Sequence, residues 1–336
     1  MSASALPPVD GLDPALLSVL ADGAFHSGEA LGQRLGISRA AVWKRVARLG
    51  EFGVDIEAVR GMGYRIAGGL SLLDADAISA RSGLPVSVLW STGSTSEDAM
   101  QRLATGDSAP FAVLAEHQRA GRGRRGRHWA SPLAGNLYMS LAWRFPVGAP
   151  RLEGLSLAVG VVIADVLERQ GLGGRVGLKW PNDIWVGRRK IGGVLIELSG
   201  NLEDACAAVI GIGINGHLPA AAAADIDQPW TDLWQETGVR PDRTLLAGEL
   251  LGRLVALLEQ FADAGFAPWQ TRWQALDALR GEQVTVATAT RSIEGRARGV
   301  DAHGALQLEV QGDVLVFHGG EVSLRESGAA PARGSA

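Results

Sequence analysis

The stretch from Gln118 to Trp129 reads Gln-Arg-Ala-Gly-Arg-Gly-Arg-Arg-Gly-Arg-His-Trp and contains five arginines, three glycines and no acidic residue. The whole chain has a formal net charge of −4, so this positive charge is a local feature. Glycine lets the backbone turn tightly and approach a ligand closely. Arginine presents a rigid, permanently charged fork that suits phosphate and carboxylate. With the flat ring of Trp129, the stretch predicts a site for an anion that carries an aromatic ring, such as a nucleotide.

The same stretch matches the G-x-G-x-x-G pattern of dinucleotide-binding folds at Gly121, Gly123 and Gly126. That pattern has its meaning only where a strand precedes it and a helix opens within it. A strand is predicted at Phe111–Glu116, but no helix opens after the glycines, and Pro132 would stop one. The sequence therefore disfavours a Rossmann turn. A solvated basic loop or a nucleic-acid patch remains as the plain alternative.

The composition is that of an ordinary globular protein, with 46% hydrophobic and 20% charged residues among 336. This length allows two or three domains. The single cysteine, Cys206, excludes an internal disulfide and suits a reducing compartment. It lies in an apolar run without a nearby histidine, which indicates a buried core residue. The N-terminus has no basic region, and no segment reaches the roughly 18 uncharged apolar residues of a spanning helix. We expect a cytoplasmic protein.

Residues 1–68 are predicted to form a winged helix-turn-helix module. Ser27 and Ser38 are placed to cap its second and third helices, and Gly36 separates the two. Three apolar residues share one face of the third helix: Val42, Val46 and Leu49. Two short strands follow at 54–59 and 63–66, around a Gly-Met-Gly turn. This order of helix, glycine turn, helix and hairpin is typical of DNA-binding modules.

The charge pattern of the module favours DNA as its partner. Between Ala30 and Gly50 there are five basic residues and no acidic residue. Contacts to phosphates and bases are predicted for six residues: Ser38, Arg39, Trp43, Lys44, Arg45 and Arg60. The alternative is a solvated helix face that binds a protein, and Trp43 either packs beneath the wing or touches a base.

The remaining chain predicts an α+β multidomain protein. Residues 69–278 mix helices and strands in a central α/β domain with a mixed sheet. Its predicted strands include Phe111–Glu116, Leu137–Phe145, Lys190–Leu198 and Ala207–Ile214, and Leu155–Leu167 is apolar nearly all round, as in a buried helix. Residues 279–326 contain short strands with tight turns, which fit a small SH3-like β-barrel. Residues 327–336 are small and polar, and we expect a frayed tail.

Four pieces of the central domain carry candidate chemistry: residues 94–96, 118–129, 179–190 and 211–215. They supply hydroxyl groups, a phosphate cradle, a further cation at Lys190, and a glycine-rich strand end. Asn182 and Asp183 offer oxygen ligands of the kind that Mg²⁺ prefers. Each piece also has a purely structural explanation, as a helix cap, a turn or a surface lysine. Together they indicate nucleotide-dependent activation of a carboxylate.

Three motifs in this order resemble those of the bifunctional biotin protein ligase and biotin operon repressor family. They are Gly-Arg-Gly-Arg-Arg-Gly-Arg-His-Trp at 121–129, Lys-Trp-Pro-Asn-Asp at 179–183 and Gly-Ile-Gly-Ile-Asn at 211–215. The resemblance covers nearly the whole chain. It implies a ligase that uses ATP and Mg²⁺ to form biotinyl-5′-AMP. Biotin would then pass to a lysine of the biotin carboxyl carrier protein of acetyl-CoA carboxylase. It also implies a homodimer, formed with adenylate, that binds biotin operator DNA.

The resemblance assigns roles by motif position. Catalysis would fall to Arg124, Lys190 and Asp183. Biotin would be held by Ser94, Thr95, Ser96, Gln118, Arg122, Gly123, Arg124 and Lys190. ATP and adenylate would meet Arg122, Arg124, Arg125, Arg127, Trp129, Asn182, Asp183 and Asn215. Mg²⁺ would lie near Asp183 and Asn182. One departure is Ser96, where the family usually has Asn after Ser-Thr, and it puts that single biotin contact in question.

Two other functions compete with this interpretation. The first is a DNA-binding regulator whose central domain senses a ligand without ligase activity. Lys190, Asp183 and the complete arginine stretch favour catalysis over sensing. The second is a lipoate-type protein ligase. The Gly-Arg-Gly-Arg-Arg-Gly motif and the winged helix disfavour it.

Overall fold

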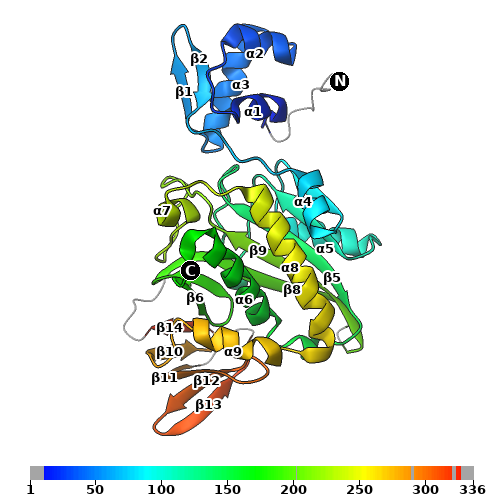
Figure 1. Cartoon of the computed structure of the whole chain (residues 1–336), viewed down its shortest axis with the longest axis vertical. Coiled ribbons are helices and arrows are strands. Elements are labelled where there is room, and N and C mark those ends of the chain that lie inside the picture. The colour runs from blue at the N-terminus through cyan, green and yellow to red at the C-terminus, as the bar shows by residue number, and fades with distance from the viewer. Residues whose placement is uncertain (1–10, 202, 289–290, 320–322, 327–336) are drawn as a thin grey trace.

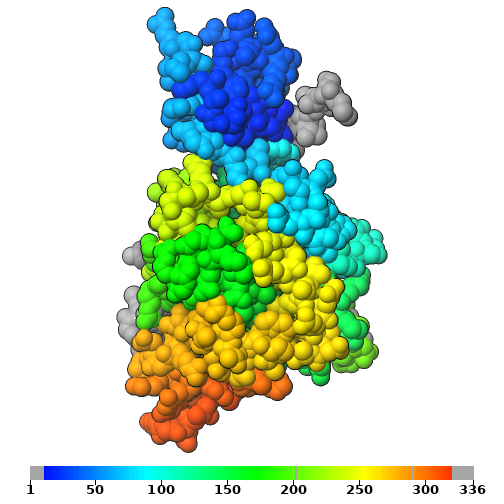
Figure 2. Space-filling view, viewed as in Figure 1, coloured from blue at the N-terminus to red at the C-terminus, as the bar shows by residue number. Residues whose placement is uncertain are grey.

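The chain is arranged along its long axis as a small helical module, a central domain built on one sheet, and a small β domain (Figure 1). This computed structural model describes residues 11–201, 203–288, 291–319 and 323–326. The predicted tail 327–336 and the start of the last predicted strand, Val322, lie outside the described residues. In the space-filling view of Figure 2, the helical module meets the central domain at a narrow waist. The predicted multidomain α+β class is confirmed.

The helical module contains α1 (Pro14–Leu20), α2 (Gly28–Leu35), α3 (Arg39–Glu51), β1 (Ile56–Val59) and β2 (Gly63–Ile66). Each helix begins at a capping side chain, because Asp13, Ser27 and Ser38 each accept a hydrogen bond from a backbone N–H three residues on. Gly36 ends α2 with φ 66°, a left-handed conformation that glycine adopts without strain. β1 and β2 form an antiparallel hairpin. The predicted winged helix-turn-helix is confirmed.

The core of this module continues into the central domain. Leu133 and Ala134 of the central domain are buried in the same hydrophobic cluster as Leu16 and Val42 of the module. Trp90 and Leu72 pack against this cluster as well. The helical module is therefore docked on the central domain and is not joined to it by the linker alone.

The central sheet has seven strands in the order β3-β4-β5-β9-β8-β7-β6. They are β3 (Val86–Leu89), β4 (Phe111–Ala115), β5 (Leu137–Phe145), β6 (Val176–Lys179), β7 (Asp183–Val186), β8 (Arg189–Asn201) and β9 (Ala205–Ile214). β3 and β4 are parallel and are joined through α5, whereas every other pair in this sheet is antiparallel. The predicted mixed sheet is confirmed.

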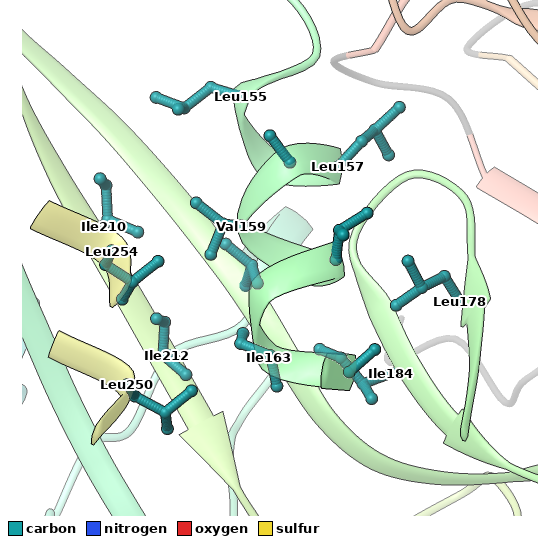
Figure 3. Close-up of a cluster of buried hydrophobic side chains, with 14 of the residues drawn as sticks. Leu155, Leu157, Val159, Ile163, Leu178, Ile184, Ile210, Ile212, Leu250 and Leu254 are labelled. Atoms are coloured by element: carbon teal, nitrogen blue, oxygen red, sulfur yellow. The ribbon is translucent and has the colours of Figure 1, made fainter. Parts of the chain in front are cut away.

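Six α-helices of the described chain surround this sheet: α4 (Ala75–Ser82), α5 (Thr95–Ala104), α6 (Leu155–Leu167), α7 (Leu233–Thr237), α8 (Arg243–Ala264) and α9 (Ala267–Leu276). α6 and α8 pack together on one face, and α4 packs on α8. Figure 3 shows the resulting core, in which Leu155 and Val159 of α6 lie near Ile210 of β9 and Leu254 of α8. α5 covers the opposite face at the β4, β5 and β9 end. None of the described helices combines the length and apolarity that crossing a membrane would require.

The alternation of residues along β9 leaves room for a site on the α5 face. Ile210, Ile212 and Ile214 belong to the core under α6 and α8. Because successive residues of a strand face opposite sides, Gly211 and Gly213 lie on the other face. Neither has a side chain to fill the space there. The sequence of this strand therefore builds a core on one face and a hollow on the other.

The C-terminal domain is a five-stranded antiparallel sheet in the order β13-β12-β11-β10-β14. Its strands are β10 (Gln283–Ala287), β11 (Ser292–Val300), β12 (Leu306–Val310), β13 (Asp313–Phe317) and β14 (Ser323–Glu326). Val284 and Leu308 are buried in the same cluster as the core of the central domain. Trp180 Nε1 donates a hydrogen bond of 3.1 Å to Gly304 O, which ties the Lys-Trp-Pro-Asn-Asp motif to this domain. The predicted boundaries at residues 68 and 278 fall between helices and strands and remain predictions.

Candidate active site

A cavity of about 380 Å³ lies on the face of the sheet that carries Gly211 and Gly213. Its lining includes residues of five neighbouring strands: Tyr138 of β5, Gly213 of β9, Lys190 of β8, Asp183 of β7 and Lys179 of β6. Strands in a sheet lie about 4.8 Å apart, so four steps across them span about 19 Å. A cavity of this length accommodates an extended ligand or two substrates end to end.

One end of the cavity is lined by hydroxyl and amide groups at the start of α5. Thr95 donates to Gln118 Oε1 from its backbone N at 2.9 Å and from Oγ1 at 3.2 Å. Ser96 Oγ lies 3.0 Å from Ser140 Oγ, and Thr95 Oγ1 lies 2.8 Å from the same atom. Gln118 Nε2 donates to Ser131 Oγ at 3.0 Å. These buried groups hold one another in place and suit a small polar ring.

The arginine stretch closes on itself as a loop over the cavity. Gly123 N donates to Arg127 O at 2.7 Å, and Trp129 N donates to Gly121 O at 2.8 Å. A side chain at Gly121 would not fit, because a Cβ there would lie 2.5 Å from Trp129 O and from Ser131 Oγ. A single turn of 3₁₀ helix at 124–126 forms the tip, where Arg125 has φ 59°. For a residue other than glycine this left-handed conformation is strained, a feature often found at ligand-binding loops.

The indole of Trp129 covers the middle of the cavity. A Cβ on Gly213 would lie 2.5 Å from its ring, so glycine at that position is what lets the ring approach β9. Lys190 Nζ lies 5.4 Å from the ring centroid, within the range of a cation–π contact. Trp129 Nε1 is buried and has no hydrogen-bond partner. The flat ring and its unsatisfied donor suit a planar heterocycle.

Charged groups meet beside this ring. Lys190 Nζ lies 2.5 Å from Asp183 Oδ1, and both side chains are largely buried. Arg124 Nη1 donates to Asn182 Oδ1 at 3.2 Å, and Asn182 Nδ2 donates to Val194 O at 2.8 Å. Burial lowers the pKa of Arg124, an effect that the nearby Asp183 opposes. Arginine remains charged at neutral pH, so two cations face the centre of the cavity in a partly dehydrated setting, where they stabilise negative charge strongly.

The structure brings nearly all the predicted substrate-binding residues to this cavity. Those that line it are Ser94, Thr95, Ser96, Gln118, Arg122, Gly123, Arg124, Arg125, Arg127, Trp129, Asn182, Asp183 and Lys190. Arg122 is also held at the rim by two carboxylates, Glu197 at 2.9 Å and Glu97 at 3.5 Å. It therefore anchors the loop to α5 and β8.

Asn215 is not part of the lining. It is buried behind the cavity, where Asn215 Nδ2 donates to Thr231 O at 3.0 Å. Thr231 N in turn donates to Lys190 O at 2.9 Å. In this structure Asn215 supports the wall that carries Lys190, and its predicted contact with adenine remains a prediction.

Several lining residues were missed in the sequence. They are His128, Tyr138, Met139, Lys179, Trp185, Arg188, Asp227, Gln228 and Pro229, among others. Lys179 opens the Lys-Trp-Pro-Asn-Asp motif, and its Nζ lies 4.8 Å from the centroid of the Trp185 ring. Its place in that motif was a usable signal. The segment 227–229 carried none, because the backbone pairing that brings it beside Lys190, with Lys190 N donating to Pro229 O at 2.9 Å, depends on the tertiary fold.

The acidic residues near the cavity bear on the predicted Mg²⁺ site. No group of three or more His, Cys, Asp or Glu side chains within the described residues is placed to hold an ion. Asp183 and Asn182 offer oxygens to the cavity, yet these oxygens already face Lys190 and Arg124. Such a pair suits Mg²⁺ that arrives with phosphate oxygens, since Mg²⁺ binds proteins through one or two carboxylates and keeps substrate and water ligands.

The predicted DNA contacts lie on α3, at its N-cap and on the hairpin turn, all within the helical module at the top of the view in Figure 1. Arg39, Lys44 and Arg60 are exposed, and Trp43 is 61% exposed. Trp43 therefore does not pack beneath the wing. Ser38 serves as the N-cap of α3. Arg45 forms an ion pair with Asp13, the N-cap of α1, and so contributes to the packing of the module.

Comparison with known proteins places this arrangement in a family. The bifunctional ligase/repressor BirA of Salmonella typhimurium is 44% identical over 317 residues, which cover 93% of this chain and 97% of that protein. This chain belongs to the family of bifunctional biotin protein ligases and repressors. BirA of Escherichia coli is 42% identical with the same coverage. Family models agree: an HTH domain matches 15–65, the biotin/lipoate A/B protein ligase family matches 92–215, and the biotin protein ligase C terminal domain matches 280–325.

A solved structure supports the same assignment for the two C-terminal parts. The biotin protein ligase from Aquifex aeolicus in complex with biotin and ATP superposes with a TM-score of 0.61 at 28% identity. The match covers 72% of this chain and 99% of that one. Members of the biotin ligase and repressor family thus share with this chain both the ligase core and, in the BirA proteins, the helix-turn-helix module.

Proposed function

We propose that this chain joins biotin to protein in two steps. A carboxylate oxygen of biotin attacks the α-phosphorus of ATP, the bond to the bridging oxygen breaks, and pyrophosphate leaves. The amine of a lysine on the biotin carboxyl carrier protein then attacks the acyl carbon of the biotinyl-5′-AMP. An amide forms, AMP departs, and the amine loses its proton. The relationship to the BirA proteins and the cavity that spans five strands support this proposal.

The observation that carries the proposal is the order of groups along that cavity. The hydroxyl end at Thr95 and Gln118 suits the polar ring of biotin. Arg124 and Lys190 then face the point where carboxylate and phosphate would meet, and the ring of Trp129 suits adenine. No side chain needs to form a covalent bond. Catalysis would come from alignment of the two substrates and from neutralisation of charge on the phosphate oxygens.

ATP would enter with Mg²⁺, which neutralises charge on its phosphates. Asp183 and Asn182 are the residues that would lie beside the ion. In the structure, an oxygen of Asp183 pairs with Lys190 and an oxygen of Asn182 accepts from Arg124, so the charge of Asp183 is neutralised within the cluster. ATP would therefore exchange these contacts for contacts with its own phosphates.

The second proposed activity is repression of biotin synthesis genes. The helix-turn-helix module presents Arg39, Trp43 and Lys44 as exposed residues of α3 and Arg60 on the hairpin turn. Biotin operator DNA would be bound by two copies of the chain, and the adenylate would promote their association. The relationship to ligase/repressor proteins over 97% of their length supports this proposal.

Transfer to a carrier domain tests the ligase proposal. The purified protein with biotin, Mg-ATP and a biotin carrier domain should give avidin-detectable carrier. Lys190→Met should reduce the rate by about 100-fold or more, because one preorganised charge near the reacting oxygens is worth roughly that much. Arg169→Met, which removes a surface ion pair with Glu249, is the matched control and should keep the wild-type rate. Absence of label, with lipoate accepted instead, would assign the chain to the lipoate-type ligases.

Gel-shift measurements test the repressor proposal. Binding to the biotin promoter should require both biotin and ATP. Binding that is independent of both ligands would separate DNA recognition from the adenylate, and absence of binding under all conditions would leave a ligase alone.

A further inference from the structure

A buried ion pair outside the cavity centres on Arg243, the first residue of α8. Its side chain is almost fully buried and forms an ion pair with Glu116, which is equally buried. Arg243 Nη1 also donates to Asn136 O at 3.0 Å, and Arg243 Nε donates to Ser71 O at 2.8 Å. One guanidinium thus joins three segments that are distant in sequence.

This arrangement is not explained by helix stability. A cation at the first residue of a helix lies at the positive end of the helix dipole, where it is disfavoured. Burying an ion pair also carries a desolvation penalty that often exceeds the Coulombic gain. Such pairs are best attested where they fix one arrangement of the chain among several. The three contacts of Arg243 show which segments of the chain this ion pair holds in fixed relative positions.

The first contact leads to the hydroxyl end of the cavity. Glu116 follows the last residue of β4, and Gln118, which holds Thr95, is two residues further. The other oxygen of Glu116, Oε1, accepts a hydrogen bond of 2.6 Å from Leu73 N. The carboxylate is therefore held from both sides. Any shift of Glu116 would carry Gln118 with it.

The second contact leads to the wall that carries Lys190. Asn136 is fully buried, and its Oδ1 accepts a hydrogen bond of 3.0 Å from Gly216 N. Gly216 follows Asn215, whose side chain donates to Thr231 O. Thr231 pairs with Lys190 through the backbone. Arg243 is therefore linked to the backbone of Lys190 by a series of hydrogen bonds and the covalent connections between them.

The third contact is with the linker between the DNA-binding module and the central domain. Ser71 O accepts from both Arg243 Nε and Arg243 Nη2, and Ser71 Oγ accepts from Arg243 N at 3.1 Å. The linker is thus fixed to the same guanidinium as the two cavity walls.

We propose that Arg243 is a positioning residue that sets the distance between the two ends of the cavity without touching either substrate. It holds the Gln118 side through Glu116 and the Lys190 side through Asn136. The linker contact makes this spacing depend on how the DNA-binding module is attached. This inference rests on the proposed ligase function, because it assigns biotin to one end and ATP to the other.

The test measures binding to each end separately. Calorimetry gives dissociation constants for biotin and for α,β-methylene ATP. Arg243→Met should weaken both by about tenfold, since displacement of a binding group by a fraction of an ångström has effects of that size. Glu116→Gln should weaken biotin alone, and Asn136→Ala should weaken the ATP analogue alone. Arg253→Met, which removes a surface ion pair on the same helix, should change neither.

A double variant separates positioning from stability. Arg243→Met alone leaves the charge of Glu116 buried without its partner and should lower the thermal midpoint. Adding Glu116→Gln removes this second charge, so the double variant should regain most of the lost thermal midpoint. If the double variant still binds biotin and the ATP analogue weakly while its thermal midpoint recovers, the positioning role is supported. If binding recovers together with the thermal midpoint, the positioning role is overturned. If Arg243→Met does not fold, the double variant, Glu116→Gln and Asn136→Ala provide the test of the positioning role. A wild-type protein that binds neither ligand would instead reject the proposed function.

Discussion

Asp277 lies where α9 meets the C-terminal sheet, in surroundings that oppose its charge. Burial raises the pKa of its carboxyl group to about 6, despite a backbone hydrogen bond from Leu279 N at 3.0 Å. Its second oxygen, Oδ2, is buried without a partner. At neutral pH the folded protein therefore carries a charge that its environment disfavours.

Replacing this carboxylate should stabilise the protein at high pH only. The pKa of Asp277 in the folded protein lies above the ordinary value of about 3.8. Between pH 4 and pH 6 the folded state therefore keeps a proton on this carboxyl group that the unfolded state has released. The contribution of this group to stability is full below about pH 4 and is lost as the pH rises through 6. We expect Asp277→Asn to raise the free energy of unfolding by about 1–3 kcal/mol at pH 8. The variant should give no gain at pH 4.

Urea denaturation at the two pH values measures this difference. Asp263→Asn, on the exposed side of α8, is the control and should leave the free energy of unfolding unchanged at both. An equal gain from Asp277→Asn at pH 4 and pH 8 would show that ionisation of Asp277 is not the cause.

Individual residues were predictable from the sequence where a motif carried them. Lys190 and Asp183 were singled out because they lie near or within the Lys-Trp-Pro-Asn-Asp motif, and the structure brings them within 2.5 Å. Glu116 and Arg243 were not singled out. They are 127 positions apart, and nothing in the local sequence of either residue indicates its partner. Pairings of this kind depend on the tertiary fold.

At the scale of elements, the glycines of β9 determine the shape of the site. Gly213 leaves the space that the Trp129 ring occupies, while the neighbouring isoleucines fill the core on the other face. A side chain on the open face would compete with the ring for that space. The strand therefore combines a structural role with a role in binding.

Gly213→Ala should weaken nucleotide binding with little effect on the fold. A methyl group there would lie 2.5 Å from the Trp129 ring, so the ring must move away from β9. We expect the KM for ATP to rise by about tenfold, since misplacement by about 1 Å has effects of that order or larger. The KM for biotin should change less. Gly50→Ala is the matched control, because a Cβ at Gly50 meets no neighbouring atom. A wild-type KM for ATP would show that the ring does not bind the nucleotide.

Elements were predictable where one local pattern dominated. The predicted helix Leu155–Leu167 has the bounds of α6, since its apolar surface must be buried on all sides. The predicted strand Lys190–Leu198 is shorter than β8, which runs to Asn201 because it pairs with β9 as far as Ala205. The parallel pairing of β3 with β4 was not predicted. The parallel pairing depends on the path of α5 between the two strands. The sequence of either strand alone does not determine that path.

At the scale of the whole molecule, the helix-turn-helix module meets the central domain next to the hydroxyl end of the cavity, where Gln118 lies. Phe52, the C-cap of α3, packs edge-on against His117, with ring centroids 5.4 Å apart. His117 Nδ1 lies 3.1 Å from Ser91 Oγ, and Gln118 is the next residue along the chain. Desolvation lowers the pKa of His117 from its ordinary value. Burial therefore favours the neutral ring of His117.

Docking of the module should weaken in mild acid. The docked pKa lies below the ordinary value of about 6.5, so the undocked state takes up the proton first as the pH falls. The contribution of the contact is full above about pH 6.5 and declines below it. We expect proteolytic cleavage in the linker, residues 67–72, to speed up between pH 7 and pH 5.5. Phe52→Ala should speed it up at both values and reduce the pH dependence. Cleavage that does not respond to Phe52→Ala would mean that other contacts hold the module.

The pairing of Arg45 with Asp13 has a consequence for how the protein responds to ionic strength. Of the predicted DNA contacts, Arg39, Lys44 and Arg60 are exposed cations, whereas Arg45 is already neutralised within its own chain. Each phosphate contact releases condensed counterions and adds about 0.9 to the slope of log affinity against log salt. Two copies with three contacts each would give a slope of about −5.

Asp13→Asn keeps an N-cap for α1, because asparagine caps helices as well as aspartate, but it releases Arg45. The slope for two copies should then steepen by about 2, as measured by operator binding between 50 and 200 mM salt. An unchanged slope would show that the freed Arg45 does not reach the DNA. If α3 enters the DNA groove as predicted, the carboxylate that pairs with Arg45 would limit how sharply a rise in salt releases the protein from DNA.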